Sequence, residues 1–427
     1  MKTYHTYKPS GIEWIGNIPE HWEVKRLKYK ISYQKGKNPK ELKSTQTENS
    51  EIYLAMDYLR DSSKQVFYVE NPEEYVIVND NEILLLWDGS NAGEFIKSKK
   101  GVLSSTMAAL TLNEIDKDYT FHYLKTFEKY LKESTIGMGI PHVNGEEFKN
   151  SLFVFPNINE QDDIATYLDR KTGEVDSIIA NKQKLIAFYE EEKQTIINQS
   201  VTRGVDKTVK LKPSGMEWLG DIPEHWDRPC IRHVCQFVLD GTHGSFPRVS
   251  NGYRLLSVRN IINDEFVFRD DDSKVSEEHF VEISKRFLIQ ENDIQLAIVG
   301  ATLGKVAVVK SLPETFVTQR SVATLRTNEK CIPVFLFYFF KTTNFQSYLW
   351  LNAGFSAQPG VYLGTIQSSY IPLPKTEEQE SIVAYIKQKC SHLDTLIEKL
   401  KKQIELFQEY RTTLISEVVT GKVKVSE

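Results

Sequence analysis

Cysteine is scarce in this 427-residue sequence, and its four cysteines form no Cys-x-x-Cys pair. This excludes a disulfide framework and a thiolate zinc site, and it favours the reducing cytoplasm as the location of the protein. Long hydrophobic runs are also missing. The most apolar stretch, Val334 to Phe340, is far shorter than the ~18 residues of a membrane-spanning helix. The first residues lack the apolar core of a signal peptide.

The sequence also lacks an excess of positive charge. The 53 Lys and Arg residues oppose 58 Asp and Glu residues, for a formal net charge of −5. This argues mildly against a protein whose whole surface binds nucleic acid, but it leaves room for local basic faces. Hydrophobic residues make up 40% of the chain, which is enough for packed cores, and the length predicts two to four domains.

The most informative feature of the sequence is an internal repeat. Lys8–Trp22 returns as Lys212–Trp226 with twelve of the fifteen positions identical. A second pair, Pro156–Asp162 and Pro374–Glu380, shares a Pro-x-x-x-Glu-Gln pattern at a different offset. Each half therefore consists of an opening motif, a middle and a closing segment, and the second middle is longer than the first.

The two middles share a frame but little else. Glu82–Gly93 resembles Asp293–Gly304, and both middles mix short β-rich runs with Gly, Asn and Ser. We predict strands at 76–78, 83–86 and 306–309, and a short helix in each middle at 121–132 and 334–348. A shared frame with divergent contents is typical of one fold that carries two specificities.

The closing segments are predicted to be long helices. Their apolar residues recur every three or four positions over about ten turns, and no proline interrupts them. At ~1.5 Å per residue each helix is ~60 Å long, and so long an apolar stripe needs a partner, for which the other copy is the obvious choice. Because the second helix ends where an opening motif should follow, we expect the two termini to lie close together and a pseudo-two-fold axis to relate the halves.

The strongest enzyme-like feature is Glu23-Val24-Lys25, which follows Glu20 and resembles the carboxylates and lysine of a metal-dependent nuclease. The second copy reads Asp227-Arg228-Pro229 and loses both functional residues. Phosphate-binding glycine loops and zinc-protease or hydrolase motifs are absent from the sequence. We therefore interpret the opening motif as structural, with two tryptophans packed into the base of the domain and two hydrogen-bonded turn histidines: Trp14, Trp22, His21 and His225.

Two basic clusters lie in the first middle. Eight Lys and Arg residues oppose two Glu residues between positions 23 and 43, and Lys97, Lys99 and Lys100 follow a Gly-Ser-Asn turn. Such clusters suit contact with DNA phosphates, which supplies affinity but reads no sequence. A solvated charged face explains them equally well.

The second middle contains loops with side chains that can read bases, at 241–248, 318–321 and 356–360. Arg and Gln can pair bidentately with guanine and adenine edges, and Gly lets a loop enter a groove. Each loop by itself is weak evidence for DNA reading. The duplicated architecture around the loops is what makes them candidates.

The duplicated Lys-Pro-Ser-Gly-x-Glu-Trp-x-Gly-x-Ile-Pro-Glu-His-Trp motif, the Pro-x-x-x-Glu-Gln helix starts and the two long helices resemble the specificity (S) subunit of type I restriction–modification systems, over residues 8–423. The resemblance implies an α+β fold in which two pseudo-two-fold-related mixed α/β globular recognition domains are joined by two long antiparallel coiled-coil helices. The predicted segments are a first target recognition domain at 1–155, a first spacer helix at 156–204, a second recognition domain at 205–373 and a second spacer helix at 374–427.

The resemblance further implies that each domain reads one half of a bipartite, asymmetric DNA sequence, while the helices set the distance between the half-sites. Candidate reading loops are 34–40, 88–93, 104–107 and 139–144 in the first domain, and 241–248, 300–305, 319–321 and 355–360 in the second. Candidate DNA-binding residues are Lys35, Lys37, Lys40, Asn91, Lys97, Lys99, Ser105, His142, Asn144, Thr242, His243, Ser245, Arg248, Lys305, Gln319, Arg320, Ser321 and Gln358.

A subunit of this kind is not an enzyme by itself. It docks two methyltransferase (M) subunits and works with restriction (R) subunits, and S-adenosylmethionine, ATP and Mg²⁺ are expected on those partners, with no cofactor or metal on this chain. The alternatives are a stand-alone DNA nuclease or methyltransferase, and a coiled-coil adaptor that reads no DNA. Because the chain is acidic overall, we expect weak, salt-sensitive DNA binding by the chain alone and tight binding in the complex.

Overall fold

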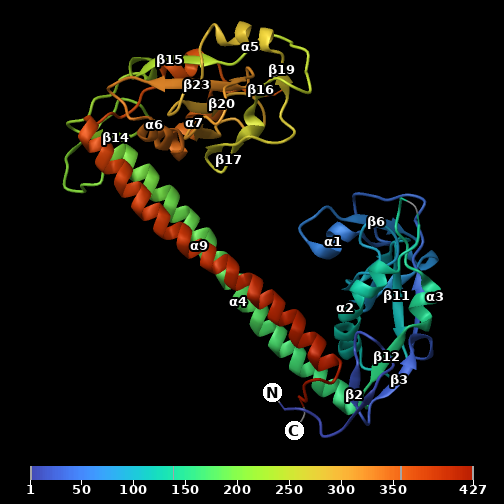
Figure 1. Cartoon of the computed structure of the whole chain (residues 1–427). Coiled ribbons are helices and arrows are strands. Elements are labelled where there is room, and N and C mark those ends of the chain that lie inside the picture. Colours follow the sequence, from blue (N-terminus) through green and yellow to red (C-terminus); the bar gives the residue numbers. More distant parts are fainter. Residues whose placement is uncertain (1, 138, 356–357, 426–427) are drawn as a thin grey trace. The chain divides into compact units, whose positions relative to one another are not determined.

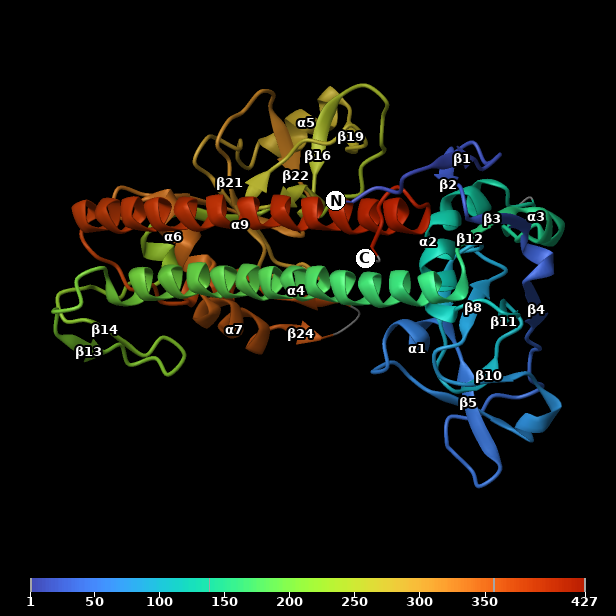
Figure 2. The same ribbon diagram turned by 90° about the horizontal axis from the view of Figure 1, so that it is seen from below.

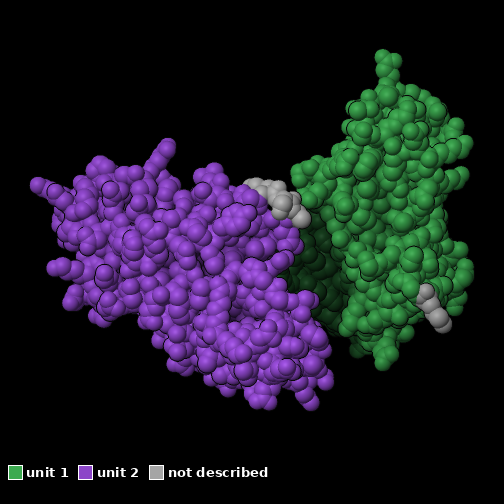
Figure 3. Space-filling model, turned by 90° about the horizontal axis from the view of Figure 1, so that it is seen from above, with its two compact units in different colours: residues 1–182, 402–427 green, residues 183–401 purple. Residues whose placement is uncertain are grey.

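A computed structural model describes residues 2–137, 139–355 and 358–425. The chain forms two compact units, Met1–Lys182 with Lys402–Glu427, and Gln183–Lys401, which Figure 3 shows in different colours. Each unit contains one globular domain and one end of each long helix. In the described part of the chain, no helix has the length and hydrophobicity needed to cross a membrane.

The first domain and the helix that leaves it contain, in chain order, β1 (Tyr7–Pro9), β2 (Asn17–Pro19), β3 (Glu23–Arg26), η1 (Leu27–Tyr29), β4 (Ile31–Lys35), β5 (Ser50–Leu54), α1 (Met56–Arg60), β6 (Phe67–Glu70), η2 (Pro72–Glu74), β7 (Ile77–Val78), β8 (Ile83–Leu86), β9 (Phe95–Lys97), β10 (Gly101–Leu103), β11 (Met107–Leu112), α2 (Lys117–Glu133), α3 (Gly145–Asn150), β12 (Leu152–Phe155) and α4 (Ile158–Arg203).

The second domain and its helix contain β13 (Leu211–Pro213), β14 (Asp221–Pro223), η3 (Ile231–His233), β15 (Cys235–Asp240), β16 (Tyr253–Leu256), η4 (Val258–Asn260), β17 (Ile261–Ile262), β18 (Glu265–Phe266), β19 (Lys274–Val275), α5 (Glu277–Ser284), β20 (Ile294–Ala297), β21 (Val306–Val308), β22 (Phe316–Thr318), β23 (Val322–Thr327), α6 (Pro333–Phe340), α7 (Thr343–Leu351), β24 (Gly354–Phe355), β25 (Pro359–Gly360), α8 (Leu363–Ser368) and α9 (Thr376–Val419).

Both domains are built on the same frame of two small sheets. The strand orders are β4-β11-β8-β9 and β6-β5-β10-β7 in the first domain, and β15-β23-β20-β21-β18-β17 and β19-β16-β22 in the second. In each domain the second of these sheets contains an equivalent parallel pair, β5 with β10 or β16 with β22. The predicted shared frame is confirmed, and the second domain adds the β17–β18 hairpin to it.

Strand β8 shows how the sequence builds the core of the first domain. All four of its side chains are buried, and successive side chains of a strand point to opposite faces. Ile83 and Leu85 join the core that contains helix α2, whereas Leu84 and Leu86 join a smaller core that includes Leu54 of the other sheet. Each of these fully buried aliphatic side chains contributes roughly 1.5–3 kcal/mol relative to exposure.

The helix predicted at 121–132 lies within α2, but the prediction of a single helix at 334–348 is wrong. Helix α6 ends at Phe340 and α7 begins at Thr343. Between them, the Thr342 hydroxyl accepts a hydrogen bond from the Phe345 N–H at 3.2 Å. Thr342 therefore caps a new helix, and the apolar residues on both sides hid this break from the periodicity analysis.

The two long helices lie side by side and run antiparallel (Figures 1 and 2). Helix α4 has 46 residues and α9 has 44, so each is about 65–70 Å long at ~1.5 Å per residue. Polar side chains pair across them at Asp176 with Arg411, Lys182 with Gln403, and Lys193 with Asp394. The partner number falls along α9 as the residue number rises along α4, as antiparallel pairing requires.

Both helices contribute to both cores. In the first unit the buried residues from the two helices include Ile164, Leu168, Leu414 and Val418. In the second unit they include Ile197, Val201, Ile382 and Ile386. Each domain is thereby attached by hydrophobic burial to the start of one helix and the end of the other.

The duplicated motifs meet at a carboxylate on the first turn of each helix. Glu160 is buried, and its carboxylate accepts hydrogen bonds from the Tyr4 hydroxyl at 2.7 Å and the Trp22 indole at 3.2 Å, while His21 Nε2 lies 2.9 Å away. Burial, together with the neighbouring carboxylate, raises the pKa of the Tyr4 phenol well above its ordinary value. The opening motif is therefore a structural clamp on the helix start.

The second copy repeats this clamp. His225 Nε2 lies 2.9 Å from the Glu378 carboxylate, and the Trp226 indole donates to it at 3.0 Å. The two histidines are thus hydrogen-bonded turn residues, as predicted. The expectation for Trp14 is wrong, because this side chain is 41% exposed, whereas Trp22 is fully buried. Trp14 lies on the surface over Tyr123, with ring centroids 6.0 Å apart.

The ends of the helices close the repeat on itself. Gly421 terminates α9 with φ of +73°, and a Cβ there would lie 2.3 Å from Pro19 Cδ of the first opening motif. Beyond it, the Lys424 N–H donates to the Lys2 carbonyl at 2.9 Å. The two ends of the chain therefore lie close together, as predicted (Figure 1). The pseudo-two-fold axis between the halves stays a prediction.

Replacing Gly421 with alanine should lower the free energy of unfolding by about 1–3 kcal/mol, because the left-handed backbone and the contact with Pro19 both oppose a Cβ. Gly173→Ala is the matched control. Gly173 is an exposed residue inside α4 with no atom near its Cβ position, so this change should add about 0.5–1 kcal/mol. Chemical denaturation measures the free energy of unfolding of both variants. Equal effects would contradict the close packing of Gly421 against Pro19.

Candidate nucleic-acid interface

In the first domain, the four predicted reading loops meet at one edge of the β4-β11-β8-β9 sheet. The Gly36 N–H donates to the Met107 carbonyl at 3.0 Å, and the Asp88 N–H donates to the Thr106 carbonyl at 3.2 Å. The Gly89 N–H donates to the Pro141 carbonyl at 2.9 Å. These bonds join the segments 34–40, 88–93, 104–107 and 139–144 into one cluster, which we call the first loop edge.

The second domain has an equivalent second loop edge, made of 241–248, 300–305, 319–321 and 355–360. The Arg320 N–H donates to the Thr242 carbonyl at 3.0 Å, and the Gly300 N–H donates to the Pro359 carbonyl at 2.8 Å. The predicted loop at 355–360 includes Ser356 and Ala357, which lie outside the described residues.

Sheet topology explains why segments so distant in sequence come together. β4 and β8 both pair antiparallel with β11, so their last residues lie beside its first two residues, Met107 and Ala108. A glycine follows β4 in the first domain and β15 in the second, because the chain passes very close to the neighbouring loop there. A Cβ at Gly36 would lie 2.2 Å from the Ser104 carbonyl oxygen, and one at Gly241 would lie 2.1 Å from that of Thr318.

A carboxylate holds an imidazole at the first loop edge. Asp88 Oδ1 lies 2.6 Å from His142 Nδ1, and Asp88 Oδ2 accepts a hydrogen bond from Lys35 Nζ at 3.4 Å. The Asp88 side chain is 23% exposed, against 46% for His142 and 41% for Lys35. The Lys35 ammonium also lies 5.1 Å from the Trp87 ring centroid, a cation–π contact that supports its extended position.

The second loop edge has a similar arrangement. Asp240 Oδ2 lies 2.6 Å from His243 Nε2, and Asp240 Oδ1 accepts from Arg286 Nη1 at 3.0 Å. The carboxylate is 12% exposed, whereas the imidazole is 62% and the guanidinium side chain 49% exposed. A surface hollow beside this pair is also lined by Arg320, Gln358 and Tyr362.

Most of the predicted site residues lie in or next to these edges. The exposed ones are Lys35, Lys37, Lys40, Asn91, His243, Ser245, Arg248, Lys305, Arg320 and Gln358. The partly buried ones are Ser105, His142, Thr242, Gln319 and Ser321. Ser105 donates to the Asn38 side chain at 2.7 Å, which ties two loops of the first edge together. Their contact with DNA stays a prediction.

Two predicted residues lie outside the loop edges, and a third, Asn144 at the end of the segment 139–144, is used in a helix cap. Lys97 pairs with Asp118 of helix α2 at 2.8 Å, and Lys99 donates to the Tyr58 carbonyl at 2.7 Å. Asn144 caps helix α3 by accepting from the Glu147 N–H at 3.2 Å. Each of these side chains already has a structural partner.

The sequence analysis missed the two carboxylates and Arg286. Asp88 and Asp240 directly precede the Gly residues of predicted loops, and this position was the available signal. Arg286 lies 46 residues from its partner and carried no local signal. Tyr362, 83% exposed beside the hollow, was also missed.

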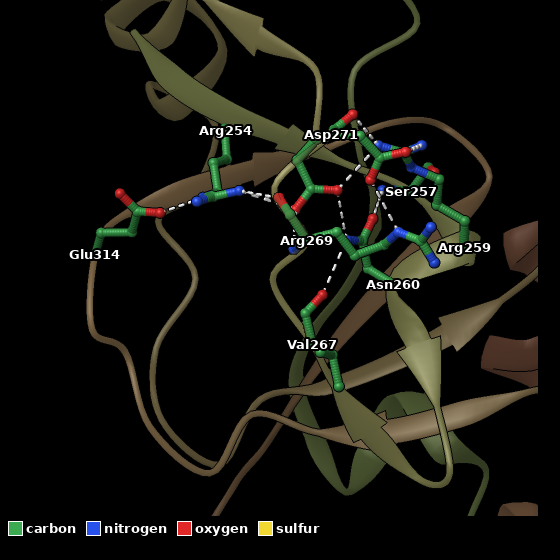
Figure 4. Close-up of polar contacts among 9 residues, drawn as sticks. Arg254, Ser257, Arg259, Asn260, Val267, Arg269, Asp271 and Glu314 are labelled. Carbon is green, nitrogen blue, oxygen red and sulfur yellow. Dashed lines mark hydrogen bonds and ion pairs between the residues drawn. The ribbon is translucent and has the colours of Figure 1, made fainter. Parts of the chain in front are cut away.

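A larger polar cluster lies elsewhere in the second domain (Figure 4). The buried Asp272 carboxylate accepts hydrogen bonds from Arg254 and Arg259 at 3.1 Å each and from Asn260 at 2.9 Å. Arg269 continues the cluster with its N–H on Asp272 at 2.8 Å. These bonds hold β16, η4 and the following loop together, so we assign the cluster a structural role.

The nuclease-like segment has no catalytic geometry. Glu23 and Lys25 pair with each other on the exposed strand β3. Among the residues that the structure describes, no group of three or more His, Cys, Asp or Glu side chains could hold a metal ion.

Known proteins match this chain over most of its length. The model of a family described as the type I restriction modification DNA specificity domain matches residues 19–187 and 250–406, one match in each half. The chain is 32% identical over 418 residues to the type I restriction enzyme MjaVIII specificity subunit of Methanocaldococcus jannaschii, covering 96% of this chain and 94% of the relative. It is 22% identical to the EcoBI specificity subunit of Escherichia coli, covering 86% of this chain and 78% of the relative.

Solved structures share the fold. A chain from a structural study of complex assembly and conformational transition of the type I R-M system aligns with a TM-score of 0.72 at 15% identity, covering 95% of this chain and 99% of that one. The crystal structure of the HsdS subunit from Thermoanaerobacter tengcongensis aligns with a TM-score of 0.52 at 15% identity, covering 95% and 98%. The chain therefore belongs to the specificity subunits of type I restriction–modification systems, which are non-catalytic DNA-recognition components.

Proposed function

We propose that this chain selects the DNA target of its complex by reading two half-sites, one with each loop edge. The observation that carries the proposal is the repetition of one four-loop edge on one frame with different side chains. A frame that presents different polar groups at the same position is suited to reading two different short sequences. The two loop edges can thus diverge without disturbing the cores beneath them.

The side chains of the two edges suit different kinds of contact. The first edge offers Lys35, Lys37 and Lys40, which can pair with phosphates and set the register on DNA. The second offers Arg320 and Gln358, whose forked groups match guanine and adenine edges. Because the chain carries a net charge of −5, we infer that partner subunits supply much of the phosphate contact.

We infer that the helices both space the half-sites and dock two methyltransferase subunits. The polar pairs between α4 and α9 fix their register, which a spacer of defined length requires. Large apolar side chains also remain exposed on the helices. Leu406 and Tyr410 in the first unit are 51% and 42% exposed, and Phe188 in the second is 59% exposed. Exposed aromatic and aliphatic residues of this size favour a protein partner.

We infer that the partner subunits, and not this chain, catalyse the reactions on DNA. Methyltransferase subunits would carry S-adenosylmethionine, and restriction subunits would use ATP and Mg²⁺. This chain would hold none of these groups. The complex would act on cellular DNA, and we therefore place it in the cytoplasm.

Co-expression of the chain with its methyltransferase partner in a methylation-free host should produce one bipartite, asymmetric methylation motif, which single-molecule sequencing of the host DNA would reveal. Exchanging one domain for that of a relative should change one half of the motif. The chain alone, assayed with S-adenosylmethionine or Mg²⁺, is the control and should not turn over DNA. A continuous motif, or activity of the chain alone, would contradict the proposal.

Inserting four residues into both α4 and α9, between the Lys182–Gln403 and Lys193–Asp394 pairs, should lengthen the gap between the half-sites by one or two base pairs. Four residues add about 6 Å of helix, and one base pair occupies about 3.4 Å. The same insertion in the linker at 205–210 is the control and should leave the gap unchanged. Methylation sequencing measures both, and an unchanged gap in the helix variant would refute the spacer role.

Phe188→Ser should weaken binding of the methyltransferase subunit at least tenfold, because it removes a large apolar contact. Gln183→Ser is the matched control on the same helix, since it is exposed and lies about 140° away around the helix. Titration of the labelled chain with the M subunit measures both affinities. Equal affinities would show that docking does not use this face.

A further inference from the structure

The two loop edges share a detail that the duplicated frame does not explain. In both, a carboxylate holds an imidazole at 2.6 Å, and the histidine side chain is more exposed than the carboxylate. Asp88 follows β8 and its partner His142 lies 54 residues later, whereas Asp240 ends β15 and His243 is three residues away. The same side-chain chemistry is therefore reached from different positions of the frame.

The positions of the second domain that correspond to Asp88 and His142 carry other residues. The backbone of Asp88 forms an isolated bridge with His142, and the corresponding bridge in the second domain joins Val299 to Gly360. The second domain thus has no carboxylate or imidazole at the positions used by the first. Copying during duplication accounts for the His21 and His225 turns, but not for these two pairs.

Each carboxylate also has a cation on its other oxygen. Lys35 lies 3.4 Å from Asp88 Oδ2, and Arg286 lies 3.0 Å from Asp240 Oδ1. With one oxygen on the cation, the other is directed to the imidazole. The backbone under each pair is also held. His142 exchanges two hydrogen bonds with Ile136, at 2.8 and 2.9 Å, and Asp240 pairs with Ala323 in the sheet. The carboxylates thus hold the imidazoles in place, with part of each histidine side chain exposed to solvent.

A carboxylate determines which nitrogen of a neutral imidazole carries the proton. The nitrogen that faces the carboxylate is the N–H donor, so the outward nitrogen keeps its lone pair and can accept a hydrogen bond. In His142 the outward nitrogen is Nε2, and in His243 it is Nδ1. In the DNA major groove, the base groups that donate hydrogen bonds are the amino groups of adenine and cytosine.

We propose that His142 and His243 each read an adenine or cytosine amino group in their own half-site, and that Asp88 and Asp240 are positioning residues that fix the reading tautomer. This inference rests on the proposed function and adds the specificity-determining groups to it. An acceptor at a fixed point favours amino bases and disfavours guanine and thymine, whose groups at that position in the groove are keto acceptors.

The test replaces each carboxylate with the isosteric amide in the complex with the methyltransferase subunit. An amide can present either its oxygen or its NH₂ group to the imidazole, so both tautomers become available. Asp88→Asn should relax one adenine or cytosine position of the first half-site about tenfold and leave the second half-site unchanged. Asp240→Asn should do the reverse. Methylation sequencing and competition among duplexes with single substitutions measure the preference.

Control variants separate positioning from folding. Asp118→Asn and Asp264→Asn remove carboxylates that pair with Lys97 and Lys341 outside the loop edges, and both should leave the motif unchanged. The unaffected half-site in each variant is an internal control for folding. His142→Ala should relax the same position as Asp88→Asn, and the double variant should add nothing, because both changes remove one reading group.

Failure of the proposed function and failure of the carboxylate–imidazole inference give different results. If the wild-type complex produces no bipartite motif, the proposed function itself fails. If it produces one and Asp88→Asn leaves both halves unchanged, relaxes both equally, or relaxes a guanine or thymine position, the carboxylate–imidazole inference is wrong. Additive effects of Asp88→Asn and His142→Ala at different positions would also overturn it.

Discussion

A carboxylate at the start of each long helix, buried at Glu160 and partly exposed at Glu378, makes the interaction on which the rest of this molecule depends. Glu160 collects the Tyr4, His21 and Trp22 side chains, and so joins the opening motif to helix α4. Removing such donors from a buried carboxylate costs several kcal/mol of stability, so few substitutions are compatible with the clamp. This explains why the opening motif and the Glu-Gln helix start are the most alike parts of the two halves.

The clamps use none of the loop-edge residues, so these residues can vary without disturbing the clamps. Strand order brings four loops to one edge of one sheet in each domain, and close backbone contacts, as at Gly36 and Gly241, hold those loops without using their exposed side chains. A reading surface can then change while the core and the helix attachment stay intact. The net charge of −5 fits such a component, because its affinity for DNA can be shared with partner subunits.

Polar clusters in the two domains divide into two kinds by burial. Around Asp272, arginines surround a carboxylate that is 1% exposed, and their hydrogen-bonding capacity is used within the fold. At Asp88 and Asp240 the carboxylate is also partly covered, but the histidine side chain it holds is 46% exposed at His142 and 62% exposed at His243. Charge counts from the sequence do not distinguish the buried cluster from the exposed pairs, because both lie in segments of mixed basic and acidic residues.

The sequence by itself determined the repeat, the two long helices, the shared frame and the closeness of the termini, because these follow from local periodicity and copied motifs. It also located the loops that meet at the two loop edges, since Gly-rich turns follow predicted strands. Tertiary structure alone decided that Lys97 and Lys99 have structural partners, that Trp14 lies on the surface, and which side chains pair at the loop edges. Those facts depend on strand register and on contacts between residues such as Asp240 and Arg286, 46 positions apart, which no local pattern encodes.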